Sequence, residues 1–409
     1  MKSRAFVCDP VCALPYGHNV VGLKYFSDAI RPFWGDIIPI ASKNLPEQIS
    51  LNYGFEREFN FYYHKHIKVN EAEGSDLSPR IPLRFGGDAM LELAIRDIDN
   101  IFGKYAVSAK DSVVFPCVDY YGAMGLLSVL RKLKPENAPS VYFRFIGVME
   151  NVTLYGGNGL ITLSKKIVTA LKDGYKIRLS AETPAYADHL AGVLGIMVSV
   201  VPYPVHAEFV QSDSHQSSDD EAGTLIGDQR VFTVACPGSA RLDKGYLNLF
   251  EIFASVRRRD PKQTIKFITQ TLPVSQALAY ANYTNQLYAM PGVRLLPGAV
   301  SEDEMNTLYK FSNLVLLPYD PTVYAYRGSA VFMECISRGI PVIGLAGSAF
   351  CKQIDYYGSG SVVSSIGEFT EYIFSYRDMS ARSISSGMLQ ARHRYSVDSE
   401  SGITNWIGQ

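Results

Sequence analysis

Short apolar runs alternate with longer amphipathic stretches along most of the chain, a pattern that predicts strands alternating with helices. Residues 5–8 form the first apolar run and end in a loop rich in proline and glycine. A helical pattern follows over residues 20–30, and residues 37–41 are the next expected strand. This order of strand, loop, helix and strand is typical of the start of a doubly wound parallel sheet.

The alternation continues after residues 52–70, a polar and aromatic stretch that we interpret as an excursion outside the sheet. Further strands are expected at residues 112–117, 141–147, 177–182 and 197–204, with helices at 122–134, 162–173 and 185–194.

A second series follows an acidic, serine-rich stretch at residues 206–228 that has no periodicity. Its expected strands are 231–238, 264–270, 293–298, 314–319 and 341–346, and its helices are 246–259, 274–287, 301–312 and 328–338. The sequence therefore predicts an α/β protein with two doubly wound, Rossmann-like domains. Their expected bounds are 1–205 and 231–385, with a linker at 206–230 and a C-terminal segment, 386–409, that packs back across the domains.

Composition narrows the class of protein. A chain of 409 residues with 47% apolar and 19% charged residues is long enough for two cores. The net charge of -1 indicates no general attraction to nucleic acid, so we expect no nucleic-acid partner. Six cysteines without a C-x-x-C pair indicate reduced, buried thiols.

The sequence also bears on location. The first twenty residues do not resemble a signal peptide, and no apolar run is long enough to span a membrane, so we expect a cytoplasmic protein. The basic cluster at residues 131–134 is either a solvated helix end or a contact with the inner face of a membrane.

Two cations stand at an expected strand-to-helix turn, in the segment GSARLDKG. Arg241 and Lys244 lie between Gly238 and Gly245. An arginine fork and a movable ammonium suit a pyrophosphate, and glycines allow the backbone to approach it. The alternative is that both cations are solvated loop charges.

A second constellation follows the expected strand at residues 314–319. Arg327, Gly328 and Ser329 precede a helix whose free amides would face an anion. Glu334 lies further along that helix among apolar residues, where a carboxylate needs a partner such as a ribose diol. The alternative is that Glu334 is a surface helix residue.

With these motifs the chain resembles the large retaining, nucleotide-sugar glycosyltransferase family that has the GT-B fold, in which two Rossmann-like domains face each other across a cleft. The segment G-x-x-R-x-x-K-G at residues 238–245 looks like its phosphate-binding element, and residues 318–343 look like its donor-binding helix region. The resemblance implies a donor site in the C-terminal domain, formed by Arg241, Lys244, Gly298, Gly328, Ser329, Ala330 and Glu334. In it Arg241 and Lys244 bind the diphosphate, Glu334 binds the ribose, and the turn ending at Gly298 contacts the nucleobase.

The chain departs from the family pattern at one position. The first glutamate of the family's pair would fall at Tyr326, which has no carboxylate. We therefore expect Tyr326 or Arg327 to contact a sugar hydroxyl or a phosphate instead.

The N-terminal domain would then bind the acceptor. The loop after its first strand contains Gly17, expected near the donor, and His18, a candidate base or donor contact. Asp119 is a candidate catalytic or acceptor-orienting group, or else the N-cap of a helix. Asp97 and Asp99 have the spacing of a metal-binding pair but lie in a helical pattern, so we expect no metal and no other cofactor.

The sequence thus predicts a metal-independent glycosyltransferase, of the hexosyltransferase kind, with a nucleotide-sugar donor and a sugar or lipid-linked acceptor. Two alternatives stay open: a nucleotide-sugar epimerase on the same fold, and a non-catalytic partner subunit that binds nucleotide sugars.

Overall fold

The computed structural model describes residues 3–14, 18–60, 87–147, 153–154, 157–204, 225–226, 229–271, 278–298 and 300–408. The chain forms two compact units. The described residues up to Pro204, together with Asp398–Gly408, form the first unit, and those from residue 225 to Val397 form the second. Most of the expected linker at 206–230, and Gly17, lie outside the described residues.

The first unit contains a seven-stranded sheet in which all pairs are parallel. Its strand order is β3 (Glu56–Phe59), β2 (Asp36–Ser42), β1 (Arg4–Asp9), β4 (Ser112–Phe115), β5 (Ser140–Phe145), β8 (Ile177–Ala181) and β9 (Ser199–Val200). The order runs outwards from β1 in both directions, so the point of reversal lies between β1 and β4.

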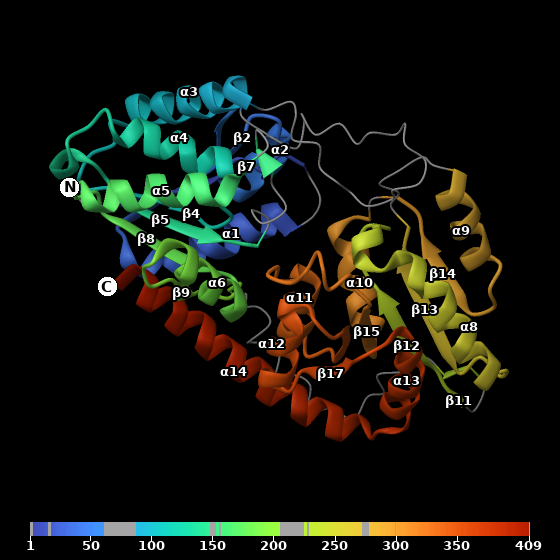
Figure 1. Ribbon diagram of the computed structural model, residues 1–409. Coiled ribbons are helices and arrows are strands. Elements are labelled where there is room, and N and C mark those ends of the chain that lie inside the picture. The colour runs from blue at the N-terminus through green and yellow to red at the C-terminus, as the bar shows by residue number, and fades with distance from the viewer. Residues whose placement is uncertain are drawn as a thin grey trace. The chain divides into compact units, whose positions relative to one another are not determined.

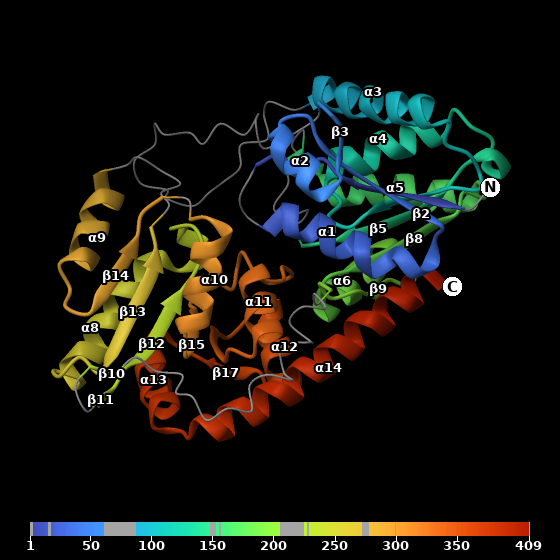
Figure 2. The same ribbon diagram turned by 180° about the vertical axis from the view of Figure 1, so that it is seen from behind.

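Helices cover both faces of this sheet (Figures 1 and 2). They are α1 (His18–Ile30), α2 (Glu47–Tyr53), α3 (Gly87–Tyr105), α4 (Tyr120–Leu130), α5 (Gly159–Lys172) and α6 (Pro184–Leu194). α3, α4 and α5 lie side by side on one face, and α1 packs on β1 and β2 from the other face. A short antiparallel pair, β6 (Thr153–Leu154) and β7 (Gly157–Asn158), precedes α5.

Strand β3 corrects one expectation from the sequence. We interpreted residues 52–70 as lying outside the sheet, but Glu56–Phe59 pairs in parallel with β2 at the sheet edge. Three of its four residues are charged, which is common for edge strands because their outer side is open to water. That composition hid the strand from an analysis of apolar periodicity.

The second unit contains a six-stranded parallel sheet. Its order is β14 (Val293–Leu296), β13 (Ile265–Gln270), β12 (Phe232–Cys236), β15 (Leu314–Leu317), β16 (Val342–Leu345) and β17 (Gly360–Val363). Its helices are α8 (Leu249–Arg259), α9 (Leu278–Tyr288), α10 (Glu302–Phe311), α11 (Ala330–Arg338), α12 (Ala349–Tyr357) and α13 (Phe369–Asp378), and β10 (Leu225–Ile226) pairs with β11 (Gln229–Arg230). Here the order reverses between β12 and β15.

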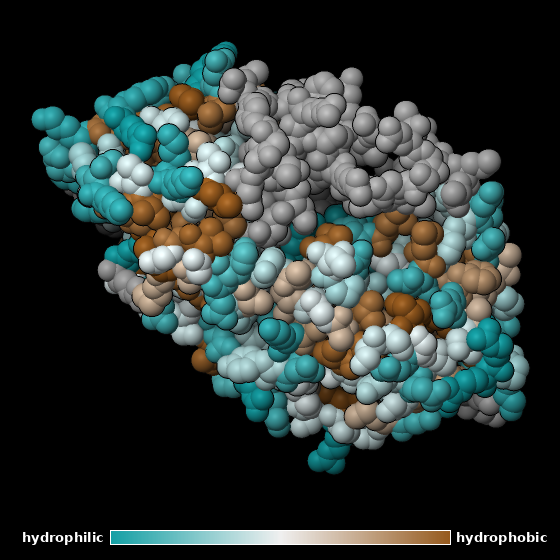
Figure 3. Space-filling view, in the orientation of Figure 1, coloured by the Kyte–Doolittle hydropathy of each residue, from teal (hydrophilic) through white to brown (hydrophobic). Residues whose placement is uncertain are grey.

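Each sheet is covered by apolar helix faces that form a core. In the second unit the rings of Phe253 on α8 and Phe267 on β13 stack with centroids 3.9 Å apart, and Leu314 and Leu316 of β15 are buried beside them. On the face shown in Figure 3, hydrophobic and hydrophilic side chains are interspersed on both units. The alternation of strand and helix expected from the sequence is therefore the arrangement that buries the apolar residues.

Helix α14 (Ala381–Gly408) carries the chain from the second unit into the packing of the first. Trp406 is buried with its ring edge-on to Tyr142 of β5, at 5.7 Å between centroids. Arg178 of β8 donates a hydrogen bond of 2.8 Å to the carbonyl of Ile407. Its positive charge also interacts favourably with the negative, C-terminal end of the helix dipole. A Cβ at Gly402 would lie 2.5 Å from the carbonyl oxygen of Val200, so the helix meets β9 at very close range.

We expect Trp406→Ala to lower the free energy of unfolding of the first unit by about 3–5 kcal/mol, because it removes a large buried ring. The other tryptophan, Trp34, also lies in the first unit, so its fluorescence during urea denaturation reports that unit. Asn405→Ala, at an exposed position of the same helix, is the control. Equal stability of the two variants would show that this helix end adds little to the first unit.

Candidate functional site

The loops that follow β12 and β15 meet at the point where the strand order of the second sheet reverses. The backbone N–H of Asp320 donates a 2.9 Å hydrogen bond to the carbonyl of Asp243. Gly245 has φ 70°, and a Cβ there would lie 1.9 Å from the carbonyl oxygen of Pro318. The two loops therefore touch through their backbones, at the position where sheets of this kind bind ligands.

Arg241 and Lys244, the cations singled out in the sequence, both lie in the first of these loops. Arg241 binds the carboxylate of Asp243 with two N–H groups, Nε to Oδ1 at 2.8 Å and a terminal nitrogen to Oδ2. The Asp243 side chain is 1% exposed and that of Arg241 is 34% exposed. The fork that we expected to hold an anion is thus bound to Asp243, and the remaining guanidinium N–H groups are available to a ligand.

Lys244 is half-buried, with Nζ 5.8 Å from the centroid of the Tyr319 ring. Burial, and next the positive charge of Arg241, lower the pKa of Lys244 to about 8. Gly238 has φ 107°, and a Cβ there would lie 2.7 Å from Nζ. The backbone conformation therefore favours a glycine at 238, and a side chain there would displace the ammonium group of Lys244.

Gln270, at the carboxyl end of β13, joins this loop to the turn after β14. Its Oε1 accepts a hydrogen bond of 3.1 Å from the N–H of Gly238. Its Nε2 donates one of 3.1 Å to the carbonyl of Gly298, the residue expected at the nucleobase. The sequence analysis missed Gln270, because a bridge between two distant loops leaves no local pattern.

The helix that carries Glu334 ends at Arg338 as expected, but it begins at Ala330, two residues later than the expected stretch 328–338. Ser329 is the N-cap of α11, and its hydroxyl accepts a 3.2 Å hydrogen bond from the N–H of Phe332. Ala330 is the first helical residue, so its amide lies in the first turn. The half-buried residues Tyr326, Arg327 and Gly328 lie in the loop just before it.

The carboxylate of Glu334 has a partner within the protein, as its apolar surroundings require. We expected a ribose diol, whereas the partner in the structure is Arg338. Oε2 of Glu334 accepts a hydrogen bond of 3.0 Å from Nε of Arg338, one turn later. Arg338 also donates to Oδ1 of Asn306 on α10, at 2.7 Å. The Glu334 side chain is 23% exposed, so solvent reaches part of it. The carboxylate is thus oriented by an arginine of its own helix, and Asn306 of α10 in turn binds that arginine.

In the first unit, Asp119 is the N-cap of α4, and its Oδ1 accepts a 2.8 Å hydrogen bond from the N–H of Gly122. Burial raises the pKa of Asp119 to about 6. Burial also raises the pKa of Asp9, at the end of neighbouring β1, to about 7, and the charge of Asp119 adds to this rise. Asp9 was missed by the sequence analysis. The two carboxyl groups lie at the ends of the strands between which the first sheet reverses.

The remaining candidates of the first unit are His18 and Gly17. His18 is the first residue of α1, and Gly17 lies outside the described residues. Arg144 is wholly buried and donates to the carbonyls of Val201 at 2.7 Å and Pro116 at 3.0 Å. Arg144 therefore ties strand ends together.

The structure also shows the surroundings of the two aspartates that have the spacing of a metal-binding pair, and it bears on membrane-spanning helices. Asp97 accepts a hydrogen bond from Asn60, and Asp99 pairs with Lys132. Within the described ranges no group of three or more His, Cys, Asp or Glu side chains is placed to hold a metal. No helix in the part of the chain that the structure describes is long and apolar enough to cross a membrane. All six cysteines are free, and five are buried.

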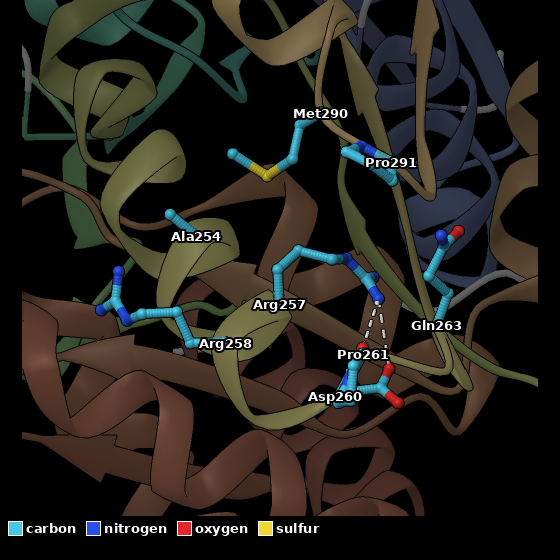
Figure 4. Close-up of a pocket in the computed structure, with 8 residues that line it drawn as sticks. All are labelled: Ala254, Arg257, Arg258, Asp260, Pro261, Gln263, Met290 and Pro291. Carbon is cyan, nitrogen blue, oxygen red and sulfur yellow. Dashed lines mark hydrogen bonds and ion pairs between the residues drawn. The ribbon is translucent and has the colours of Figure 1, made fainter.

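A pocket of about 330 Å³ lies elsewhere in the second unit, at the end of α8 and the start of β13 (Figure 4). Its residues are Ala254, Arg257, Arg258, Asp260, Pro261, Gln263, Met290 and Pro291. Arg257 points toward Asp260 and binds its Oδ2 at 3.2 Å. Because this pocket lies at the amino ends of the strands, it is separate from the loops that hold Arg241 and Lys244.

Comparison with known proteins places the fold. No family model matches the chain, and no curated protein matches it. An E. coli trehalose-6-phosphate structure bound with UDP-2-fluoro glucose matches 99% of this chain and 97% of that chain, with 11% identity and a TM-score of 0.64. A glycosyltransferase from Rickettsia africae matches over 98% and 96%, with 14% identity and a TM-score of 0.62. The chain has the GT-B fold.

The lipopolysaccharide outer core galactosyltransferase WaaB, in its apo form, has the same fold, with 11% identity, 99% of both chains matched and a TM-score of 0.61. The predicted fold class, α/β with two Rossmann-like sheets, is therefore confirmed. Identities this low establish the shared fold alone, so the chemistry has to be argued from the residues of this chain.

We expect Lys244 to titrate at about 8, below the usual lysine range near 10.4. Carbon-13 NMR of reductively methylated protein, with Lys244→Gln to assign the signal, measures this pKa. Arg241→Gln should raise the pKa because it removes a like charge, and Asp243→Asn should lower it further because it removes an opposite charge. A Lys244 signal that titrates together with the other lysines would contradict the burial argument.

We expect Arg241→Met to destabilise the second unit by about 1–3 kcal/mol, because the buried carboxylate of Asp243 loses its two charged hydrogen bonds. The double variant Arg241→Met, Asp243→Asn should recover part of this loss, since a neutral amide costs less to bury. Calorimetry on both single variants and the double variant measures the interaction energy. Additive losses would show that the pair does not interact.

Proposed function

We propose that this protein is a glycosyltransferase that moves a sugar from a nucleoside-diphosphate sugar to an acceptor hydroxyl. The observation that carries this proposal is the pair Arg241 and Lys244, held in the loop at the strand reversal of the second sheet. The shared fold supports it, since a neighbour of that fold was solved with UDP-2-fluoro glucose bound. Enzymes and binding proteins can share this fold, so the cations decide the chemistry.

Arg241 and Lys244 would bind the donor diphosphate and stabilise the charge that grows on it as the glycosidic bond breaks. Asp243 holds the Arg241 guanidinium in place, so little reorganisation is needed when the leaving group forms. With Lys244 protonated, these three side chains carry one net positive charge close to the ligand. This charge supports a metal-independent reaction in which side chains neutralise the diphosphate.

The rest of the donor site would surround the same loops. Glu334 is assigned to the ribose, with its orientation set by Arg338. The amides at Gly328, Ser329 and Ala330 are assigned to the diphosphate or sugar, since they lie at or before the start of α11. Tyr326 and Arg327 are assigned to the sugar, and the turn at Gly298 to the nucleobase.

Acceptor binding is assigned to the first unit. Asp119, at the carboxyl end of the sheet, would orient the acceptor hydroxyl or accept its proton. His18, the first residue of α1, would act as a base or contact the donor, and Gly17 is assigned to the donor. The proposed acceptor is a glycan, a lipid-linked molecule or a small molecule. The proposed reaction retains the configuration of the transferred sugar and serves polysaccharide biosynthesis. A cytoplasmic location, with contact to the inner membrane face through residues 131–134, completes this proposal.

One observation favours a second candidate function. Tyr326 stands where the related family has its first glutamate, so this chain lacks that carboxylate beside the donor sugar. A non-catalytic subunit that binds nucleotide sugars would tolerate such a change. It would bind the donor and turn over no acceptor.

The decisive experiment first screens UDP, GDP, ADP, CDP and dTDP for binding, and then measures turnover of the matching nucleotide sugar. A ligand at a hundred times its Kd should stabilise the protein by about 2.7 kcal/mol. Arg241→Ala and Lys244→Ala should each lower kcat by roughly 10²–10³-fold, because the fixed charges act on the transition state. EDTA should leave most activity intact.

Lys262→Ala, at an exposed lysine before β13, is the matched control and should keep full activity. Glu334→Gln should weaken binding of the nucleoside diphosphate by about 1.5–3 kcal/mol. If both cation variants stay within about threefold of wild type in kcat/KM, the phosphate site is elsewhere. Binding without turnover supports the non-catalytic function, and conversion of the donor without any acceptor indicates an epimerase.

A further inference from the structure

Gln270 is buried, at 6% exposure, between two loops of the candidate donor site. Its amide oxygen accepts from the N–H of Gly238 and its amide nitrogen donates to the carbonyl of Gly298, both at 3.1 Å. The residues on either side extend the same connection. Thr269 donates to the carbonyl of Cys236 at 3.2 Å, and the N–H of Thr271 donates to the carbonyl of Leu296 at 2.9 Å.

A primary amide suits this bridge because it presents an acceptor and a donor from one rigid plane. Turning the amide over would set N–H against N–H at Gly238 and oxygen against oxygen at Gly298. The bridge therefore has one direction and fixes the separation of the two backbone groups. A carboxylate of the same length would keep the bond to Gly238 and lose the bond to Gly298.

The two loops need such a restraint because each contains a glycine in the left-handed region. Gly238 has φ 107° and Gly298 has φ 76°. Glycine reaches many backbone conformations at little cost, so a loop built on it holds one conformation only when other contacts select it. Gly238 also borders Nζ of Lys244, so a shift of this loop changes the position of that cation.

We propose that Gln270 is a positioning residue that couples nucleobase binding at the Gly298 turn to diphosphate binding at the loop of Gly238 and Lys244. This inference rests on the proposed function. Both polar atoms of the Gln270 amide bind the protein backbone, so the residue acts through the two loops. A ligand that orders one loop then orders the other, and the coupling is the same in both directions.

Two variants separate the parts of the bridge. Gln270→Met keeps the length of the side chain and removes both hydrogen bonds. Gln270→Glu keeps an acceptor for Gly238 and removes the donor to Gly298, and it serves if the Met variant folds poorly. The matched control is Gln353→Met, which replaces another glutamine of 6% exposure on α12 of the same unit.

The measurement uses two probes that each occupy one part of the site. They are inorganic pyrophosphate and the free nucleoside whose diphosphate binds the wild-type protein in the screen of five. The Kd of the nucleoside is measured by ligand-observed NMR without pyrophosphate and with saturating pyrophosphate. In the wild type and in Gln353→Met, pyrophosphate should tighten nucleoside binding about fivefold or more, the lower end of typical coupling.

In Gln270→Met and Gln270→Glu the coupling factor should fall below about twofold. In Gln270→Met the Kd of pyrophosphate alone should stay within about threefold of wild type, because Arg241 and Lys244 remain. An unchanged coupling factor in both variants, or no coupling in the wild type, overturns this inference and leaves the proposed function standing. If the wild type binds none of the five nucleoside diphosphates, the proposed function fails and the inference fails with it.

Discussion

The turn that carries Arg241 and Lys244 rests directly on the loop that follows β15, and the whole candidate site depends on that backbone contact. The absence of a side chain at Gly245 allows the carbonyl of Pro318 to pack against the backbone of the turn. The hydrogen bond from the N–H of Asp320 to the carbonyl of Asp243 fixes the position of one loop relative to the other. Since the second loop leads into α11, the same contact sets the start of that helix relative to the cations. The positions of the two cations and of the start of α11 therefore depend on each other.

Electrostatics in the site follow from this packing. Two cations and one buried carboxylate are held close together, and the charges of Arg241 and Asp243 act on the pKa of Lys244 in opposite directions, the first lowering it and the second raising it. Asp243 lowers the cost of placing Arg241 beside Lys244, and it uses the arginine fork to do so. Burial and the charge of Arg241 lower the pKa of Lys244 in spite of Asp243, and an anionic ligand would offset both effects. The arrangement that lowers the pKa of Lys244 is therefore also the one on which the proposed binding of an anion rests.

Much of the fold could be predicted from the sequence because buried parallel strands are continuous apolar runs separated by amphipathic helices. Strand β3 was missed because its residues are mostly charged. The cations of the site stood out because Arg241 and Lys244 sit between glycines after an apolar run. Their geometry did not, since the pairing of Arg241 with Asp243, the partner of Glu334 and the bridge at Gln270 depend on contacts that spacing along the chain does not determine.

The path of α14 has a consequence for the order of folding during synthesis. The sheet of the first unit is complete in sequence at Pro204, yet Trp406 and the carbonyl that Arg178 binds are made roughly 200 residues later. At about 5–20 residues per second, the ribosome takes on the order of ten to forty seconds to reach them. During that interval Tyr142 lacks the ring that covers it. The nascent first unit therefore cannot complete its packing until the whole of the second unit has been synthesised.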